Sequence, residues 1–186
     1  MPRQNIVSKE PEGMNRHTVY IGIGSNVGDR FTNLQQAVDM LALVPGTSVS
    51  ALSRVYMTEP VGEVGQDRFF NAVVLVDTTL TPEALRAHCK AIEQKLGRPE
   101  HYRRWSSRTI DLDILFYDDL CINSDFLVIP HNELHRRKFV LLPLLDIDNP
   151  VHPLFHCRVA DLLKTCGDAS VPIRLKRELT AGTVSG

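Results

Sequence analysis

Residues 103–116, RRWSSRTIDLDILF, decide the fold expected for this chain of 186 residues. Apart from Asp111 and Asp113, the second half of this stretch is apolar, and side chains on a strand alternate between its two faces. The two aspartates therefore share one face, with Cα atoms about 7 Å apart. The other face takes the apolar residues Ile110, Leu112, Ile114 and Phe116. We therefore predict a largely buried strand that carries two carboxylates.

The two aspartates and the arginines before them predict a site for a metal ion and phosphate groups. Neighbouring carboxylates on a buried strand repel each other and resist desolvation, so a positive group is expected beside them. Mg²⁺ usually takes only one or two protein carboxylates and keeps its other positions for water and phosphate oxygens. Each nearby arginine would bind two phosphate oxygens at once, in a bidentate contact. The alternative is an ion-paired sheet end, in which Arg104 or Arg108 neutralises the aspartates.

Composition indicates one globular domain. The chain has 43% hydrophobic residues and a net charge of −1, so its overall charge attracts neither nucleic acid nor an anionic membrane. We expect a single domain at 17–175, a disordered N-terminal extension at 1–16 and a disordered tail at 176–186. The cysteines show no C-x-x-C spacing, and no segment has the apolar length of a membrane span or a signal core. These features favour a cytoplasmic protein with reduced thiols.

The hydrophobic pattern mixes helices with strands. Strands are expected at 19–24, 49–57, 69–78, 110–116, 121–122, 126–129 and 139–145. Helices are expected at 29–43, 81–97 and 158–165, and a turn or short helix at 133–137. Strands that often follow directly on one another indicate an α+β sandwich, with a largely antiparallel sheet and helices packed on it.

Familiar nucleotide-binding motifs do not fit this sequence. The stretch 22–28, GIGSNVG, has Val27 where the dinucleotide fingerprint needs its third glycine. The sequence has neither a Walker A lysine motif nor a kinase H-R-D set, so any ATP chemistry uses another scaffold. We expect a tight strand-to-helix turn at 22–28 whose backbone approaches a ligand.

Other segments carry residue types suited to a flat heterocycle and to phosphate. Residues 69–72, FFNA, place an aromatic face beside an amide that both donates and accepts hydrogen bonds. His131 precedes Arg137, and Phe139 begins the next apolar segment, a combination suited to a phosphate edge. Glu93 lies at the edge of the buried stripe of the 81–97 helix, within reach of the site. The alternatives are core aromatics, a structural histidine and a surface acid.

Six separated stretches, in order, resemble the 6-hydroxymethyl-7,8-dihydropterin pyrophosphokinase family of folate biosynthesis. They are 24–28 (GSNVG), 56–62 (YMTEPVG), 69–72 (FFNA), 92–98 (IEQKLGR), 104–115 (RWSSRTIDLDIL) and 129–131 (IPH) through 137–141 (RKFVL). The resemblance implies a ferredoxin-like α+β fold. It also implies transfer of pyrophosphate from ATP to the hydroxymethyl group of the pterin, with release of AMP.

The resemblance also implies roles for individual residues. Two Mg²⁺ ions would bind Asp111 and Asp113, and ATP as co-substrate would bind Glu93, Arg98, Trp105, Arg108, Ile114, His131 and Arg137. The pterin would bind Gly24, Thr58, Val61, Phe69, Asn71 and Phe139, with the two phenylalanines on its faces. The implied catalytic residues are Arg98, Arg108 and Asp113. Trp105 would lie on a loop that closes over ATP.

Two other functions compete with this one. A ferredoxin-like RNA-recognition domain would share the sandwich, but residues 137–140, RKFV, lack the internal glycine and second aromatic of its signature. A D-x-D metal enzyme acting on nucleic acid would need a wider basic face. The expected ligands are therefore ATP and hydroxymethyl-dihydropterin, with neither nucleic acid nor membrane, and the sequence indicates no partner protein.

Overall fold

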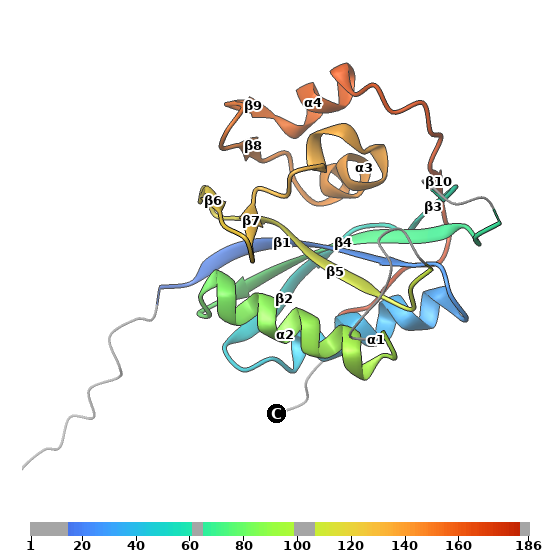
Figure 1. Cartoon of the computed structure of the whole chain (residues 1–186), viewed down its shortest axis with the longest axis horizontal. Helices are drawn as coiled ribbons and strands as arrows, with labels where there is room; N and C mark the ends of the chain where they lie inside the picture. Colours follow the sequence, from blue (N-terminus) through green and yellow to red (C-terminus); the bar gives the residue numbers. More distant parts are fainter. Residues whose placement is uncertain (1–14, 61–64, 99–106, 183–186) are drawn as a thin grey trace, which may run out of the picture.

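The computed structural model describes residues 15–60, 65–98 and 107–182, and its centre is an antiparallel sheet (Figure 1). Within these residues the main sheet has six strands in the order β10-β3-β4-β1-β5, with β2 paired to β4. Its strands are β1 (His17–Ser25), β2 (Thr47–Leu52), β3 (Tyr56–Thr58), β4 (Phe69–Thr78), β5 (Asp111–Tyr117) and β10 (Ile173–Arg174). Their pairings are antiparallel. The predicted ferredoxin-like α+β sandwich is confirmed.

Helices cover both faces of this sheet (Figure 1). Helices α1 (Arg30–Ala42) and α2 (Pro82–Lys95) lie on one face, and α3 (Lys138–Ile147) lies on the other with α4 (Val159–Thr165) packed against it. One apolar layer fills the space under α1 and α2, and a second fills the space between the sheet, α3 and α4. The short elements are β6 (Ile122–Asn123), β7 (Val128–Ile129), η1 (Leu134–Arg136), β8 (Val151–His152) and β9 (Cys157–Arg158).

Helices α1 and α2 begin where their sequences predict. The backbone N–H of Thr32 donates to Asp29 Oδ1 at 3.1 Å, which caps α1. Thr81 caps α2 by accepting from the N–H of Ala84 at 3.3 Å, and Pro82 occupies the first helical position. Gly97, with φ +91°, follows the end of α2 in the left-handed conformation that favours glycine.

In β5 the two aspartates share one face, as predicted, and the alternation of faces continues as far as Ile114, where a bulge begins. Consecutive residues of β1 pair with Ile114 and Phe116, which leaves Leu115 as an extra residue. Leu115 and Phe116 therefore both lie in the layer under α3. The prediction that Phe116 shares the face of Ile110 is wrong, because the bulge reverses the alternation that Asp111 and Asp113 establish.

The segment expected as a strand at 139–145 is part of helix α3. Its sequence is a short apolar run, and periodicity alone does not separate a buried strand from a buried helix in such a run. Leu141 and Leu144, three residues apart, face the sheet together as helical neighbours. The strand expected at 49–57 is also two strands, β2 and β3.

The tail also differs from its expected disorder as far as residue 182. Leu179 is 7% exposed and belongs to the layer under α1 and α2. The side chain of Gln35 on α1 forms two hydrogen bonds with the backbone of Thr180, at 3.0 and 2.8 Å. Composition did not predict this packing, because a single leucine provides the buried contact. Residues 1–14 of the extension expected at 1–16 and residues 183–186 of the tail lie outside the described residues. In the described part of the chain, no helix has the length and apolarity needed to cross a bilayer.

Candidate active site

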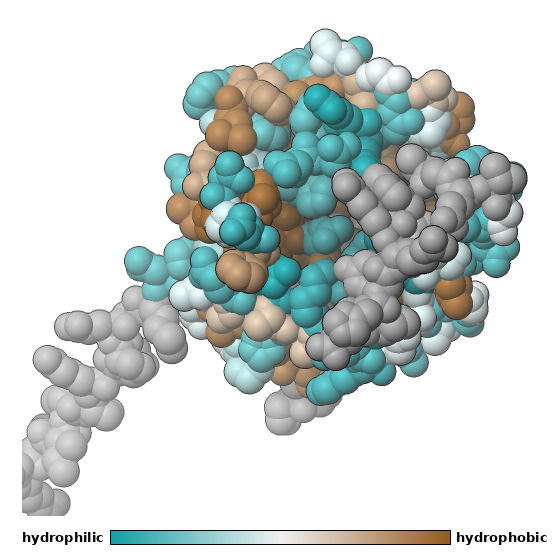
Figure 2. Space-filling view, viewed as in Figure 1, coloured by the Kyte–Doolittle hydropathy of each residue, from teal (hydrophilic) through white to brown (hydrophobic). Residues whose placement is uncertain are grey.

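A pocket of about 350 Å³ opens on the α3 side of the sheet. On the face drawn in Figure 2, hydrophilic side chains gather around a hollow near the middle of the molecule. The pocket brings together most of the predicted site residues: Gly24, Thr58, Phe69, Asn71, Arg98, Arg108, Asp111, Asp113, His131, Arg137 and Phe139. Val61 and Trp105 lie outside the described residues. Ile114 does not line the pocket, because its side chain packs into the layer under α1 and α2.

Strand β1 forms the floor of the pocket. Its Gly24 pairs with Asn71 of β4 on one side and with Asp111 of β5 on the other, and Gly22 pairs with Asp113. A Cβ atom at Gly24 would lie 3.0 Å from Asn71 Oδ1. The two glycines, on the same face of the strand, thus leave the space between the amide and the carboxylates open.

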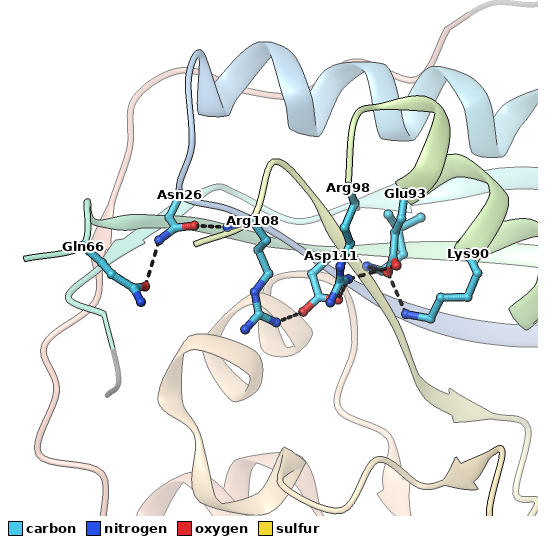
Figure 3. Close-up of polar contacts among 8 residues, drawn as sticks. Asn26, Gln66, Lys90, Glu93, Arg98, Arg108 and Asp111 are labelled. Atoms are coloured by element: carbon cyan, nitrogen blue, oxygen red, sulfur yellow. Dashed lines mark hydrogen bonds and ion pairs between the residues drawn. The ribbon is translucent and has the colours of Figure 1, made fainter. Parts of the chain in front are cut away.

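Asp111 is bound by two guanidinium groups. Arg98 Nη1 contacts Asp111 Oδ1, and Arg108 Nη1 contacts Asp111 Oδ2 (Figure 3). Burial would raise the pKa of Asp111, but the charges of Arg108 and Arg98 outweigh burial and lower it. For Asp111, the ion-paired sheet end considered from the sequence is therefore present, with Arg98 in addition to Arg108.

Asp113 differs from its neighbour. Among the described residues, it forms no ion pair. Burial and the negative charge of Asp111 raise the pKa of Asp113. A cation at this point would stabilise the ionised form. Two carboxylates are a donor set of the kind that Mg²⁺ takes, because this ion draws its other ligands from phosphate and water.

Glu93 supports the site from behind. Its side chain is 3% exposed, does not line the pocket, and contacts Arg98 Nη1 at 2.9 Å and Lys90 Nζ at 2.8 Å (Figure 3). It also accepts a hydrogen bond from the N–H of Leu112 at 2.8 Å, which ties α2 to β5. Glu93 therefore positions Arg98. Lys90, which lines the pocket, was missed from the sequence, although its spacing of three residues from Glu93 on a helix was a usable signal.

Asn26 positions Arg108. Its Oδ1 accepts a hydrogen bond from the N–H of Arg108 at 2.7 Å, and its own N–H donates to the Arg108 carbonyl at 3.1 Å. The Asn26 amide also donates to Gln66 Oε1 at 3.2 Å (Figure 3). The motif at 24–28 thus holds the backbone of the residue that carries the guanidinium. Sequence reasoning did not single out Asn26, because its partners lie far along the chain.

Thr58, Asn71 and two phenylalanines line the rest of the pocket. Asn71 Nδ2 donates to Thr58 Oγ1 at 2.9 Å, and the pairing of β3 with β4 sets this contact. Phe69 comes from β4, and Phe139 comes from the first turn of α3. Amide, hydroxyl and aromatic groups in one wall are suited to a flat polar heterocycle.

His131 and Arg137 lie on the same side as α3. The N–H of His131 donates to the Leu115 carbonyl at 3.0 Å, and its Nδ1 accepts from the N–H of Glu133 at 3.2 Å. A neutral ring that accepts at Nδ1 carries its proton on Nε2, where it is able to donate to a phosphate oxygen. Arg137 Nη2 lies 3.6 Å from Glu133 Oε2. The pocket as a whole suits the transfer of a phosphate-bearing group to an aromatic heterocycle.

Comparisons with known proteins agree with this class of enzyme. The family model for 7,8-dihydro-6-hydroxymethylpterin-pyrophosphokinase (HPPK) matches residues 20–149. A 2-amino-4-hydroxy-6-hydroxymethyldihydropteridine pyrophosphokinase of Methylorubrum extorquens is 46% identical, over 69% of this chain and 80% of its own. The Bacillus subtilis protein of the same name is 42% identical, over 69% of this chain and 76% of its own.

A solved structure of Plasmodium falciparum HPPK-DHPS A437G with pteroate has the same fold. Its TM-score is 0.66 at 16% identity, and the match covers 83% of this chain and 41% of that chain. Together with the sequence matches, this places the chain among pterin pyrophosphokinases. It belongs to the 7,8-dihydro-6-hydroxymethylpterin-pyrophosphokinase family.

Proposed function

We propose that the pocket is where this chain transfers the pyrophosphoryl group of ATP to the hydroxymethyl group of 6-hydroxymethyl-7,8-dihydropterin. One observation carries the assignment to this pocket. Gly24 pairs with both Asn71 and Asp111, so an amide suited to a heterocycle and a carboxylate suited to a metal and phosphate lie two strands apart, about 10 Å. In the reaction, the hydroxyl oxygen bonds to the β-phosphorus, the bond from that phosphorus to the α–β bridging oxygen breaks, and AMP leaves.

Asp111 and Asp113 would hold Mg²⁺, and we expect two ions with ATP. When bound, Mg²⁺ would neutralise the charge of the triphosphate. Arg98 and Arg108 contact Asp111 and line the same cavity, where they would bind phosphate oxygens. Glu93 and Asn26 hold these arginines, so little reorganisation is needed for them to stabilise charge on the transferred group.

The pterin would bind between Phe69 and Phe139. Thr58 and Asn71, already hydrogen-bonded to each other, would read its edge together with the backbone at Gly24. Transfer of a pyrophosphoryl group requires mainly that the hydroxyl be held in line with the β-phosphorus. Stacking on a rigid strand and a helix end would hold the ring in this orientation. His131 and Arg137 would bind the ATP phosphates and tail.

The decisive test is product identity. Incubation of the protein with ATP, Mg²⁺ and hydroxymethyl-dihydropterin should give AMP and pterin pyrophosphate in equal amounts, and chelation of the metal by EDTA should stop the reaction. Appearance of ADP, or AMP formation that does not depend on the pterin, would refute the proposal. Unchanged turnover in excess EDTA would refute the Mg²⁺ requirement alone.

We also propose that the chain acts on small molecules in the cytoplasm and binds neither nucleic acid nor membrane. The net charge of −1 supports this, as do the free cysteines Cys89, Cys121, Cys157 and Cys166. Titration with fluorescent single-stranded RNA at 150 mM salt should give no saturable signal. Saturable binding would instead favour the RNA-recognition alternative.

A further inference from the structure

Residues 168–180, here called the C-terminal segment, lie beyond the part of the chain that matches the family model, which ends at residue 149. From α4 the chain runs down one side of the molecule to β10, beside β3 (Figure 1). On this path it contacts two elements that contribute to the pocket, α3 and β3.

The first contact is at the start of α3. Helix α3 receives no side-chain cap from its own preceding residue, Arg137. Instead, the N–H of Lys138 donates to Asp168 Oδ2 at 2.9 Å, and the Lys138 ammonium donates to the Ser170 carbonyl at 3.4 Å. A carboxylate at this position satisfies an N–H that has no partner within the helix and interacts favourably with the helix dipole. The next residue is Phe139, so Asp168 fixes the turn that carries this aromatic ring.

The second contact is along β3. This strand has only three residues, and β10 pairs with it through Ile173 opposite Met57 and Arg174 opposite Tyr56. The N–H of Leu175 donates to the Val55 carbonyl at 2.8 Å. Without β10, β3 would be a very short edge strand, which pairing with a single neighbour stabilises weakly.

Two leucines anchor this pairing to the core. Leu175 packs against the layer under α1 and α2, and Leu179 is buried within it. At its far end, β3 carries Thr58, whose hydroxyl accepts the hydrogen bond from Asn71. Strand β3 alone therefore connects β10 with Thr58 in the pocket.

We propose that the C-terminal segment positions the pterin-binding side of the pocket, with Asp168 acting on Phe139 and β10 acting on Thr58. The inference rests on the assignment of these two residues to the pterin. Asp111 and Asp113 are carried by β5, and Glu93 and Asn26 hold Arg98 and Arg108. Arg137 precedes α3, but its guanidinium contacts Glu133, which lies outside the C-terminal segment. Loosening the segment therefore weakens pterin binding more than ATP binding.

The first test compares substitutions at Asp168. In Asp168→Ala, the pterin Kd, measured by titration calorimetry, should rise about two- to fivefold, the upper figure being reached if the whole stabilisation of an ordinary helix cap is lost from the bound state. The Kd for a non-hydrolysable ATP analogue with Mg²⁺ should change less than about twofold. Asp168 Oδ1 also accepts from the N–H of Ser170 at 2.8 Å, so Asp168→Asn keeps one of two acceptor oxygens and should recover part of the pterin affinity. The control is Asp161→Ala, which removes an exposed carboxylate on α4 that pairs with Lys164.

The second test isolates the backbone of β10. Leu175→Pro and Leu175→Ala both shorten the side chain, but only the proline also removes the N–H that donates to Val55. The pterin KM should rise further in the proline variant than in the alanine variant, with the KM for ATP similar in both.

Thermal unfolding of every variant separates positioning from a purely structural role. If the melting temperature falls while both dissociation constants stay at wild-type values, or if both rise by the same factor, the segment is only structural and the proposal is wrong. If Leu175→Pro does not fold, the comparison of Asp168→Ala with Asp168→Asn decides. Failure of the protein to release AMP at all would instead refute the proposed function.

Discussion

Asp111 and Asp113 should respond oppositely to removal of their charge, although both are expected to be essential for turnover. Repulsion between carboxylates alone would predict that either Asn variant holds or gains stability. The structure distinguishes them. Asp111→Asn leaves Arg98 and Arg108 without the carboxylate that they share, whereas Asp113→Asn removes a charge that forms no ion pair among the described residues.

The size of the effect follows from burial. Breaking a buried ion pair costs about 3–5 kcal/mol, but the Asp111 side chain is 17% exposed and Arg98 keeps Glu93 as a partner, so we expect about 2 kcal/mol. For a domain of this size, that lowers Tm by about 4–8 °C. Asp113→Asn should leave Tm unchanged or raise it, because burial and the charge of Asp111 disfavour the ionised Asp113.

The assay is thermal unfolding by circular dichroism at pH 7.5 in EDTA, with AMP release as a second measurement. Both variants should lose most of the AMP release at saturating Mg²⁺. Equal destabilisation by the two substitutions, or a larger loss of Tm for Asp113→Asn, would refute the assignment of the arginines to Asp111.

Further substitutions test the pterin side of the pocket and a buried histidine. Phe139→Ala should weaken pterin binding by about 1–3 kcal/mol, the loss of one stacking partner, and a larger loss for ATP in calorimetry would contradict this role. Gly24→Ala should raise the pterin KM, because its Cβ atom would lie 3.0 Å from Asn71 Oδ1, and an unchanged KM would argue against this floor. Burial lowers the pKa of His152 to about 4, so the neutral form stabilises the fold above about pH 6.5, and this contribution of about 3 kcal/mol is lost as the pH falls through 4. Urea unfolding of His152→Gln should show a weaker pH dependence in that range than the wild type, and an equal dependence would refute this role of His152.

Local rules predicted much of the fold. The starts of the helices predicted at 29–43 and 81–97, and alternation along β5 as far as Ile114, depend on neighbouring residues, and these predictions are confirmed. The position of Phe116 depends instead on how β5 pairs with β1, where a bulge adds one residue. A bulge is a property of two strands together, so the sequence of one strand does not reveal it.

The site was predictable in its chemistry but not in its supports. The aspartates, arginines and phenylalanines are residue types that bind metal, phosphate and aromatic rings, and most of those predicted line the pocket. The individual roles of Arg98, Phe69 and Phe139 followed from the family resemblance and stay predictions. Asn26 and Asp168 act through backbone groups at 108 and 138, which lie far away along the chain. No local pattern marks such residues, because their partners are chosen by the tertiary fold.

Charge balance explains why a neutral chain suits a highly charged substrate. Among the described residues that line the pocket, four cationic side chains stand against four carboxylates: Lys90, Arg98, Arg108 and Arg137 against Glu59, Asp111, Asp113 and Glu133. ATP brings about four negative charges, and two Mg²⁺ ions would bring four positive ones, so the complex would keep this balance. A surplus of arginine would bind ATP without a metal and in any orientation. With the carboxylates present, ATP would gain most by entering together with cations, which would hold its phosphates beside the aspartates and direct the β-phosphorus toward the pterin.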